Sequence, residues 1–410
     1  MKTLKRILAA TTLLVTLGFA SEANAQVPLE NFFKNPEKAG YQISPDGKYF
    51  SYMAPYENRL NLFVQEVGSD KATRITSETV RDLAGSMWAN GHRILYIKDT
   101  AGDENFQLYG VNVDGTDSKA YTAFPKVRTT IIDPLENIDS LVIIGLNKRN
   151  PQVFDPYRLN LNNGELTQLA ENPGNIQGWM TDHNGKLRVA LAIVDGVNTQ
   201  ILYRETEEQP FRPVLTTNFK ETVSFATFTP DNKMVYALTN IGRDKTALVL
   251  MDPATCEEKE VLYTNDKYDI SGLGYSELKK KLISVSCTGH KGTIRHYFDK
   301  NEEAIRTKLE QKLEGYDINT TSEDKSENIR IIYAGGDRTY GTYYTYNVKE
   351  DKLTKIADLA PWIKEEDMVP MHPITYTSRD GLTIEGYLTL PKGYTLSLIH
   401  ISEPTRLLSI

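Results

Sequence analysis

The sequence predicts an all-β protein, a seven-bladed β-propeller followed by one hairpin. From residues 41–358 a single unit recurs seven times, with a polar turn, a β-rich run, a loop and a second β-rich run in each copy. Repeat periods of about 40 to 50 residues are typical of propellers. Four short strands cannot bury both sheet faces alone, so we expect neighbouring units to stack around a common axis.

The first half of each unit is a polar turn followed at once by a strand-like run. The turns are rich in Pro, Asp, Asn and Gly, which favour chain reversal. They are Ser44-Pro45-Asp46-Gly47 before 49–53, Asn90-Gly91 before 94–97, 134–139 before 141–144, Asn184-Gly185 before 187–190, Pro230-Asp231-Asn232 before 234–238, Ser276-Glu277 before 282–285, and Ser322-Glu323-Asp324 before 329–333.

The second half of each unit gives the same count of seven. Apolar, β-prone runs recur in the same place and end in further turns such as Asn162-Asn163-Gly164. The runs are 62–64, 108–111, 157–161, 201–203, 248–250, 294–298 and 343–346.

Two segments depart from the β pattern. In residues 301–315 Ile305, Leu309 and Leu313 recur at helical spacing before a terminating Gly315, which predicts a surface helix inserted in the sixth blade. The segment 28–39 is a second short helical candidate within a lead-in of residues 26–40. Residues 359–371, with an acidic run, are predicted to be a linker that leaves the propeller.

A hairpin is predicted after this linker, at the start of the segment 372–394. Apolar runs flank Arg379-Asp380-Gly381, and Asp-Gly between such runs is a strong hairpin signal. An isolated two-stranded hairpin is marginal in water, so the segment implies a further sheet to join.

Residues 1–25 have the pattern of a secretory signal. Lys2, Lys5 and Arg6 precede an apolar run, and Ala23-Asn24-Ala25 offers small residues at the cleavage site, so we expect Ala23 and Ala25 to direct cleavage before Gln26. The apolar run is shorter than the ~20 residues that a membrane-spanning helix needs. We therefore expect a secreted, periplasmic protein with no membrane association after cleavage.

Composition excludes several classes of function. With 47 basic and 54 acidic side chains the chain has a net charge of −7, and without a basic stripe no nucleic-acid partner is expected. His290 and His296 are six residues apart but have no carboxylate or thiol at ligand spacing, so no metal site is expected. No cofactor is expected either. The two cysteines, Cys256 and Cys287, either pair in an oxidising compartment or remain separate thiols.

These features together resemble the prolyl oligopeptidase family of serine peptidases, in its bacterial acylaminoacyl-peptidase and dipeptidyl-peptidase branch. The specific parts are the Arg379-Asp380-Gly381 hairpin and the run Gly-Tyr-Leu-Thr-Leu-Pro-Lys-Gly at 386–393, and the stretch at 43–49 also fits. The resemblance implies that 372–394 begins an α/β-hydrolase domain, whose Ser, Asp and His cut oligopeptide substrates while the propeller limits access.

The family's catalytic residues map onto no position of this sequence. The 410 residues contain no Gly-x-Ser-x-Gly motif, and Gly85-Ser86-Met87-Trp88 lacks the closing glycine. Residues 395–410 depart from the family pattern and read as a non-native tail, the alternative being a genuine but divergent C-terminus. We therefore expect a fragment that lacks the hydrolase domain and is inactive by itself.

Substrate-binding residues stay unknown at this stage. Dipeptidyl peptidases of the family hold the peptide amine with paired glutamates, but Glu207-Glu208 and Glu302-Glu303 lie in no matching motif. We expect solvated charge pairs at both places. The alternative function is a stand-alone binding propeller of the envelope, which would have no use for the hairpin.

Overall fold

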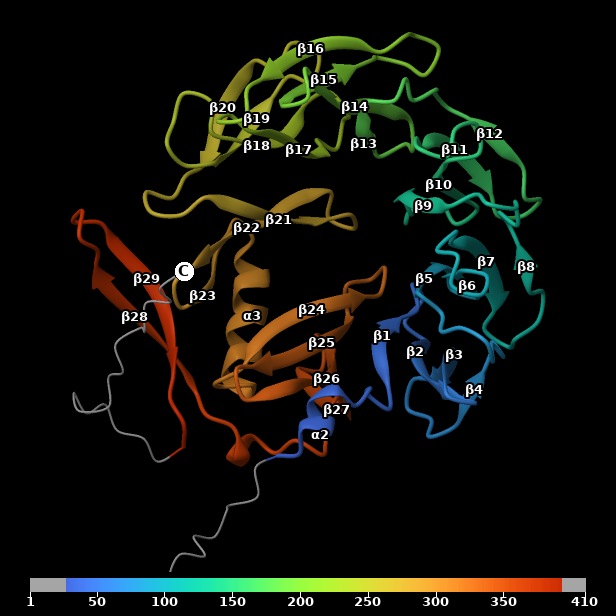
Figure 1. Cartoon of the computed structure of the whole chain (residues 1–410), viewed down its shortest axis with the longest axis vertical. Coiled ribbons are helices and arrows are strands. Elements are labelled where there is room, and N and C mark those ends of the chain that lie inside the picture. Colours follow the sequence, from blue (N-terminus) through green and yellow to red (C-terminus); the bar gives the residue numbers. More distant parts are fainter. Residues whose placement is uncertain (1–26, 393–410) are drawn as a thin grey trace, which may run out of the picture.

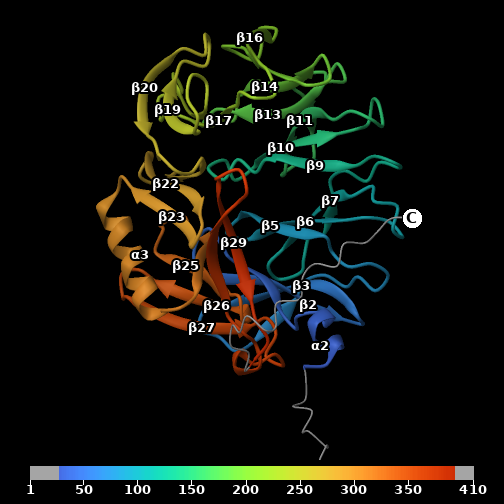
Figure 2. The same ribbon diagram turned by 60° about the vertical axis from the view of Figure 1, so that its left-hand side comes forward.

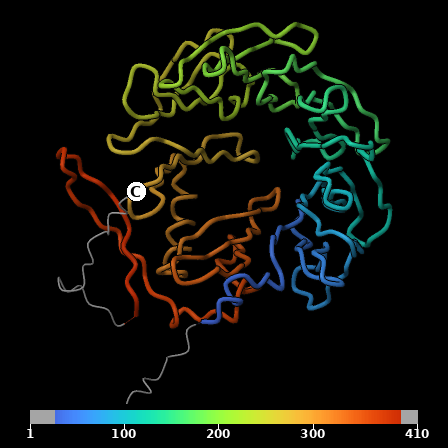
Figure 3. The backbone as a smooth tube through the Cα atoms, viewed as in Figure 1, coloured from blue at the N-terminus to red at the C-terminus, as the bar shows by residue number. Residues whose placement is uncertain are grey.

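The structure is a computed structural model that describes residues 27–392. Figure 1 looks along the axis of a ring of β-sheets, and the chain runs once around this ring from blade 1 to blade 7 (Figure 3). The expected signal cleavage at Ala23 and Ala25 and the tail 395–410 lie outside the described residues. Within residues 27–392 no helix is both long and apolar enough to cross a bilayer.

Seven sheets form the ring, which confirms the predicted seven-bladed propeller. Blade 1 holds β1 (Ala39–Ile43), β2 (Tyr49–Tyr56), β3 (Arg59–Glu66) and β4 (Ala72–Arg74). Blade 2 holds β5 (Gly85–Asn90), β6 (Arg93–Lys98), β7 (Gln107–Asn112) and β8 (Lys119–Ala120). Blade 3 holds β9 (Thr129–Asp133), β10 (Leu141–Leu146), β11 (Asp155–Asn160) and β12 (Leu166–Gln168).

The remaining blades follow in chain order. Blade 4 holds β13 (Ile176–Thr181), β14 (Leu187–Val194), β15 (Asn198–Tyr203) and β16 (Arg212–Thr217). Blade 5 holds β17 (Val223–Phe228), β18 (Val235–Thr239), β19 (Ala247–Met251) and β20 (Glu258–Tyr263). Blade 6 holds β21 (Ile270–Ser276), β22 (Lys281–Gly289) and β23 (Gly292–Tyr297), and blade 7 holds β24 (Asp317–Glu323), β25 (Ile329–Gly336), β26 (Thr339–Asn347) and β27 (Lys352–Asp358).

The core lies between the blades, because each sheet presents apolar side chains to its neighbours. Blades 1 and 2 share a cluster around Leu62 and Ile94, and blades 2 and 3 share one around Leu108 and Ile144. Further clusters join blade 4 to blade 5, blade 5 to blade 6, and blade 7 to blade 1. None of the six apolar clusters found in residues 27–392 joins blade 3 to blade 4 or blade 6 to blade 7.

The turn between the first and second strand of a blade is built on side-chain hydrogen bonds to its own backbone. In blade 1 the Ser44 hydroxyl accepts hydrogen bonds from the backbone N–H groups of Lys48 (3.0 Å) and Tyr49 (2.9 Å), while donating to Asp46 at 2.6 Å. Thr229 and Asp231 repeat this arrangement in blade 5. Such turns explain why short polar residues recur at these positions.

The ring closes without a shared strand, since every sheet consists of consecutive strands. At the contact between blades 7 and 1 the Lys325 backbone N–H donates to the Pro45 carbonyl at 2.9 Å, and side chains supply most of the remaining contact. The rings of Tyr41 and Tyr52 stack at 4.7 Å, and Tyr343 of blade 7 lies 5.4 Å from Tyr41. Ile43 donates its backbone N–H to the Ser322 hydroxyl at 3.1 Å across the same contact.

Blade 6 differs from the four strands expected in each unit, because it has only three. The predicted helix follows directly as α3 (Lys300–Lys312), capped by the Asp299 carboxylate, which accepts from the backbone N–H groups of Asn301 and Glu302. Leu309 and Leu313 are buried against blade 7. The helix is therefore half-buried where blades 6 and 7 meet, rather than purely a surface insertion.

The segments that enter and leave the propeller lie together. The entering segment forms α2 (Leu29–Phe33), and the leaving segment contains the short 3-10 helix η1 (Glu365–Asp367). The Trp362 indole donates a hydrogen bond to the Asn31 carbonyl at 2.9 Å, and the Lys34 ammonium lies 4.1 Å from the Trp362 ring. The predicted linker is thus packed against the lead-in segment.

The predicted hairpin is present as β28 (Met371–Thr377) and β29 (Thr383–Thr389). Its turn uses Gly381 at a φ of 87°, a backbone conformation that glycine adopts without steric cost. Figure 2 shows the hairpin beside blade 6. Tyr387 donates to the His290 carbonyl of blade 6 at 2.8 Å, and Glu385 pairs at 2.5 Å with Lys267 in the segment between blades 5 and 6. Met371, Tyr376 and Tyr387 remain largely exposed on the hairpin.

Replacement of Tyr41 should destabilise the protein strongly, because Tyr41 is 2% exposed and contacts aromatic rings of both blade 1 and blade 7. We expect Tyr41→Ala to lower the free energy of unfolding by about 3–5 kcal/mol, measured by urea denaturation. Tyr41→Phe keeps the ring and should cost much less. Tyr376→Ala on the exposed hairpin should change stability by less than about 0.5 kcal/mol. Equal effects of Tyr41→Ala and Tyr376→Ala would contradict the closure described above.

Candidate functional site at one mouth of the tunnel

The first strand of each blade lines the central tunnel, and the turns after these strands gather at one end of it (Figure 1). We call this ring of turns, which comprises residues 44–48, 90–93, 134–140, 182–186, 229–234, 276–281 and 324–328, the turn mouth. The hairpin lies at the opposite end of blade 6, because its contacts Tyr268 and His290 flank the start of β21 and the end of β22. The turn mouth is therefore remote from the hairpin.

Three polar contacts cross the tunnel at the turn mouth. Lys325 of blade 7 pairs with Asp139 of blade 3, with the ammonium nitrogen and carboxylate oxygen 2.7 Å apart. Glu277 of blade 6 accepts a hydrogen bond from the Asn137 amide of blade 3 at 3.0 Å and lies 3.4 Å from His183 Nδ1 of blade 4. Turns on opposite sides of the ring thus touch, which narrows this end of the tunnel.

A cavity of about 330 Å³ lies beneath these contacts, between the first strands of blades 3, 4 and 5. Acidic side chains dominate the charged part of its wall, and an indole supplies an apolar surface. The lining residues that matter here are Asp133, Glu136, Trp179, Asp182, His183 and Glu277. This is a volume in which small molecules are commonly held in proteins.

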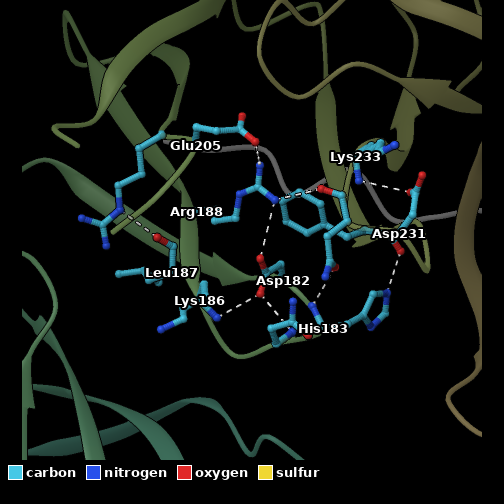
Figure 4. Close-up of polar contacts among 12 residues, drawn as sticks. Asp182, His183, Lys186, Leu187, Arg188, Glu205, Asp231 and Lys233 are labelled. Carbon is cyan, nitrogen blue, oxygen red and sulfur yellow. Dashed lines mark hydrogen bonds and ion pairs between the residues drawn. The ribbon is translucent and has the colours of Figure 1, made fainter. Parts of the chain in front are cut away.

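Most of the polar side chains at the turn mouth already have structural partners. Figure 4 shows Asp182, whose carboxylate accepts from the backbone N–H of Lys186 at 3.0 Å and lies 3.5 Å from Arg188. Arg188 also pairs with Glu205 at 3.0 Å. The His183 backbone N–H donates to the Asn232 side chain of blade 5 at 3.0 Å. These groups fix the turn and tie blade 4 to blade 5.

At the turn mouth, Glu136 is the carboxyl group whose pKa is raised above its usual value. Burial raises the pKa of Glu136, and the negative charges of Glu277 and Asp133 raise it further, whereas Lys325 opposes them. Its side chain still reaches solvent, which screens these charges. The cavity is therefore lined by several carboxyl groups, and within it the Thr181 hydroxyl donates a hydrogen bond to Asp133.

The serine and the histidines considered in the sequence analysis lie in turns or make contacts that hold the blades together. Ser86 lies on β5, and its carbonyl accepts from the Gln42 amide of blade 1 at 2.9 Å. His92 is exposed in a turn, and His296 stacks on Tyr263 with ring centroids 4.5 Å apart. His183 and His290, by contrast, are mostly buried, and His290 contacts the Gly386 carbonyl of the hairpin at 3.0 Å. In residues 27–392 no three His, Cys, Asp or Glu side chains are grouped as metal ligands.

The expectation of solvated glutamate pairs is wrong for one member of each pair. Glu207 accepts from Arg158 of blade 3 at 2.8 Å and from the Leu187 backbone N–H of blade 4 at 3.0 Å. Burial alone would raise the pKa of Glu207, but these hydrogen bonds lower it below its usual value. Only Glu208 is solvated, because adjacent residues point in different directions.

Glu302 has a similar role at the contact between blades 6 and 7. Its carboxylate takes two hydrogen bonds from Arg330, at 2.8 and 3.0 Å, and pairs with Lys279 at 2.7 Å. Burial would raise the pKa of Glu302, and the two cations lower it. Sequence reasoning missed both bridges. Arg158 is 49 residues from Glu207, and Arg330 and Lys279 are 28 and 23 residues from Glu302, so no local spacing signal connects them.

The two cysteines are free thiols in the structure. Cys256 packs on the cluster shared by blades 4 and 5, whereas Cys287 is buried in the cluster shared by blades 5 and 6. Burial raises the pKa of Cys256 to about 11 and also raises that of Cys287. The possible disulfide considered above is therefore not formed in this structure.

Removal of the Glu136 charge should stabilise the protein at neutral pH. A carboxyl group whose folded pKa is raised binds more protons in the folded state, so its contribution to stability falls as pH rises through that pKa. We expect Glu136→Gln to raise the urea midpoint at pH 7, and the gain to vanish below about pH 3, where a glutamate is protonated in the folded and unfolded states alike. Glu350→Gln, in an exposed turn, is the control and should show no such pH-dependent gain. A Glu136→Gln gain that grows toward pH 4 would contradict the assignment.

Comparison with known proteins gives sequence relatives among peptidases. The chain is 29% identical over 373 residues to dipeptidyl aminopeptidase BIII of Pseudoxanthomonas mexicana, covering 88% of this chain and 52% of that protein. It is 26% identical over 403 residues to dipeptidyl peptidase family member 6 of Caenorhabditis elegans, covering 92% of this chain and 53% of that protein. The chain thus spans about half the length of the curated relatives it matches. No family model matches it.

Solved structures with the same fold are prolyl oligopeptidases. One, from a study of two prolyl endopeptidases, superposes with a TM-score of 0.62 at 12% identity, covering 88% of this chain and 55% of that one. Prolyl oligopeptidase B from Galerina marginata superposes with a TM-score of 0.57, also at 12% identity, covering 87% and 56%. At such identities the structural match shows the fold alone. Together with the sequence relatives, it confirms the predicted resemblance of this chain to the propeller portion of the prolyl oligopeptidase family.

Proposed function

We propose that this chain is the access-limiting propeller of a secreted, periplasmic serine peptidase that hydrolyses short peptides. The observation that carries the proposal is the similarity to two dipeptidyl peptidases along almost the whole chain, together with a hairpin that continues beyond the last blade. In this proposal the hairpin is the first part of an α/β-hydrolase domain on the hairpin side of the ring.

The contacts at the turn mouth support the access-limiting role. They link blades 3, 4, 6 and 7 across the end of the tunnel that lies away from the hairpin. A folded protein cannot pass between side chains that touch across the tunnel. The cavity of about 330 Å³ beside these contacts has room for a short peptide segment.

The chain by itself is proposed to be inactive, because its 410 residues contain no Gly-x-Ser-x-Gly motif. We expect the purified chain to release no p-nitroaniline from aminoacyl, acyl-aminoacyl or dipeptidyl p-nitroanilides above the buffer rate. A serine-directed fluorophosphonate should leave it unlabelled. Hydrolysis that the fluorophosphonate blocks would disprove the proposed inactivity.

The proposed parent enzyme is tested by the reading frame of the source gene. Beyond the codon for Tyr394 we expect a Gly-x-Ser-x-Gly motif within the next few hundred residues, followed by Asp and His. A frame without this motif would reject the peptidase and favour the alternative, a stand-alone binding propeller.

Weakening the turn mouth should relax the limit on substrate size in the protein encoded by the full frame. We expect the combined change Asp139→Ala and Lys325→Ala to raise kcat/KM several-fold for a peptide of about thirty residues, because the charge pair across the tunnel is lost. Activity on a dipeptidyl p-nitroanilide should hardly change. The matched control is Lys355→Ala with Asp358→Ala, which removes an ion pair of the outermost strand of blade 7. No preference for the long peptide over this control would argue against access through the turn mouth.

A further inference from the structure

A second cavity, of about 360 Å³, lies between blades 6 and 7 and has no part in the site described above. Three elements form its wall, namely the face of blade 6 that is turned toward blade 7, the inner strands of blade 7, and α3. The residues that decide its chemistry are Ser284, Ser286, Arg295, Glu302, Arg306 and Arg330.

The residues that blade 6 contributes to the cavity wall are mostly small or polar, whereas other blades present apolar side chains to their neighbours. Cross-strand pairing places Gly272, Ser286 and Arg295 in one row, and Gly274, Ser284 and Tyr297 in the next. Side chains at the two glycines would collide with the serine hydroxyls beside them. The glycines therefore leave room for both the hydroxyl groups and the cavity.

The arginines around the cavity differ in whether a carboxylate neutralises their charge. Arg330 is held by two hydrogen bonds to Glu302, and Arg306 pairs with Glu310 at 2.7 Å. Arg295 forms no ion pair with any carboxylate of residues 27–392, and its one side-chain hydrogen bond is a long one of 3.5 Å to Asn319. Burial and the charge of Arg306 lower the pKa of Arg295, whereas Tyr297 and Glu310 oppose this shift.

We propose that the cavity between blades 6 and 7 is a binding site for a small monocarboxylate, with Arg295 as its counter-ion. The planar guanidinium matches a carboxylate with two parallel hydrogen bonds, and the Ser286 hydroxyl in the same row supplies a further donor. Because Arg295 carries one unpaired positive charge, it matches a ligand with one negative charge. A phosphate dianion would bring a second negative charge and would be repelled by Glu302. Both a free organic acid and the C-terminus of a short peptide have this chemistry.

Calorimetric titration of the full chain tests the proposal with three organic probes and with inorganic phosphate. Butyrate represents a free acid, N-acetylalanine represents a peptide C-terminus, and N-acetylalanine amide is the neutral analogue. We expect one or both acids to bind and the amide to fail, and the tighter of the two acids identifies the source. Binding of neither acid, equal binding of the amide, or tighter binding of inorganic phosphate would each overturn the proposal.

Variants locate the site. Arg295→Gln should raise the Kd of the binding acid at least about tenfold, since a charge-assisted bidentate contact is lost. Arg59→Gln removes the same charge from blade 1 and should leave the Kd unchanged. If Arg295→Gln fails to fold, Ser286→Ala, which removes only a hydroxyl, should still weaken binding several-fold. An unchanged Kd in a folded Arg295→Gln or Ser286→Ala variant would place the acid elsewhere and refute the assignment.

Discussion

The ring depends on one contact, the packing of blade 7 against blade 1. Because each sheet is made of consecutive strands, no backbone ladder crosses this contact, and aromatic side chains take its place. Tyr41, Tyr52 and Tyr343 supply a large apolar area with defined ring geometry. This contact also keeps the other blades in the ring, because separation of blade 7 from blade 1 would expose one face of each of these two sheets to water.

Elsewhere the blades are held in two different ways. Apolar clusters join most neighbours, but the contacts between blades 3 and 4 and between blades 6 and 7 lack them in the described part of the chain. Each of these contacts has a glutamate bridge instead, Glu207 to Arg158 in one and Glu302 to Arg330 and Lys279 in the other. The cavity between blades 6 and 7 lies at the second of these contacts, and Glu302 and Arg330 form part of its wall.

The sequence allowed the seven blades, the helix near 301–315 and the hairpin to be predicted, because turn residues and strand or helix periodicity are local signals. It did not reveal that blade 6 ends after its third strand. The only hint in the sequence was the lack of a further β-rich run before the helix. The contacts of Glu277 with Asn137 and His183, and those of Glu207, depend on which blades face each other. A single sequence carries no such spatial information, so these residues looked like ordinary solvated charges.

The contact between Trp362 and the Asn31 carbonyl has a mechanical consequence. It fastens the strand-free segment that leaves blade 7 to the segment that enters blade 1. A pull on the hairpin would otherwise peel β27 from the outer edge of blade 7 one hydrogen bond at a time. With the two segments fastened, the same tension is shared between blade 7 and blade 1.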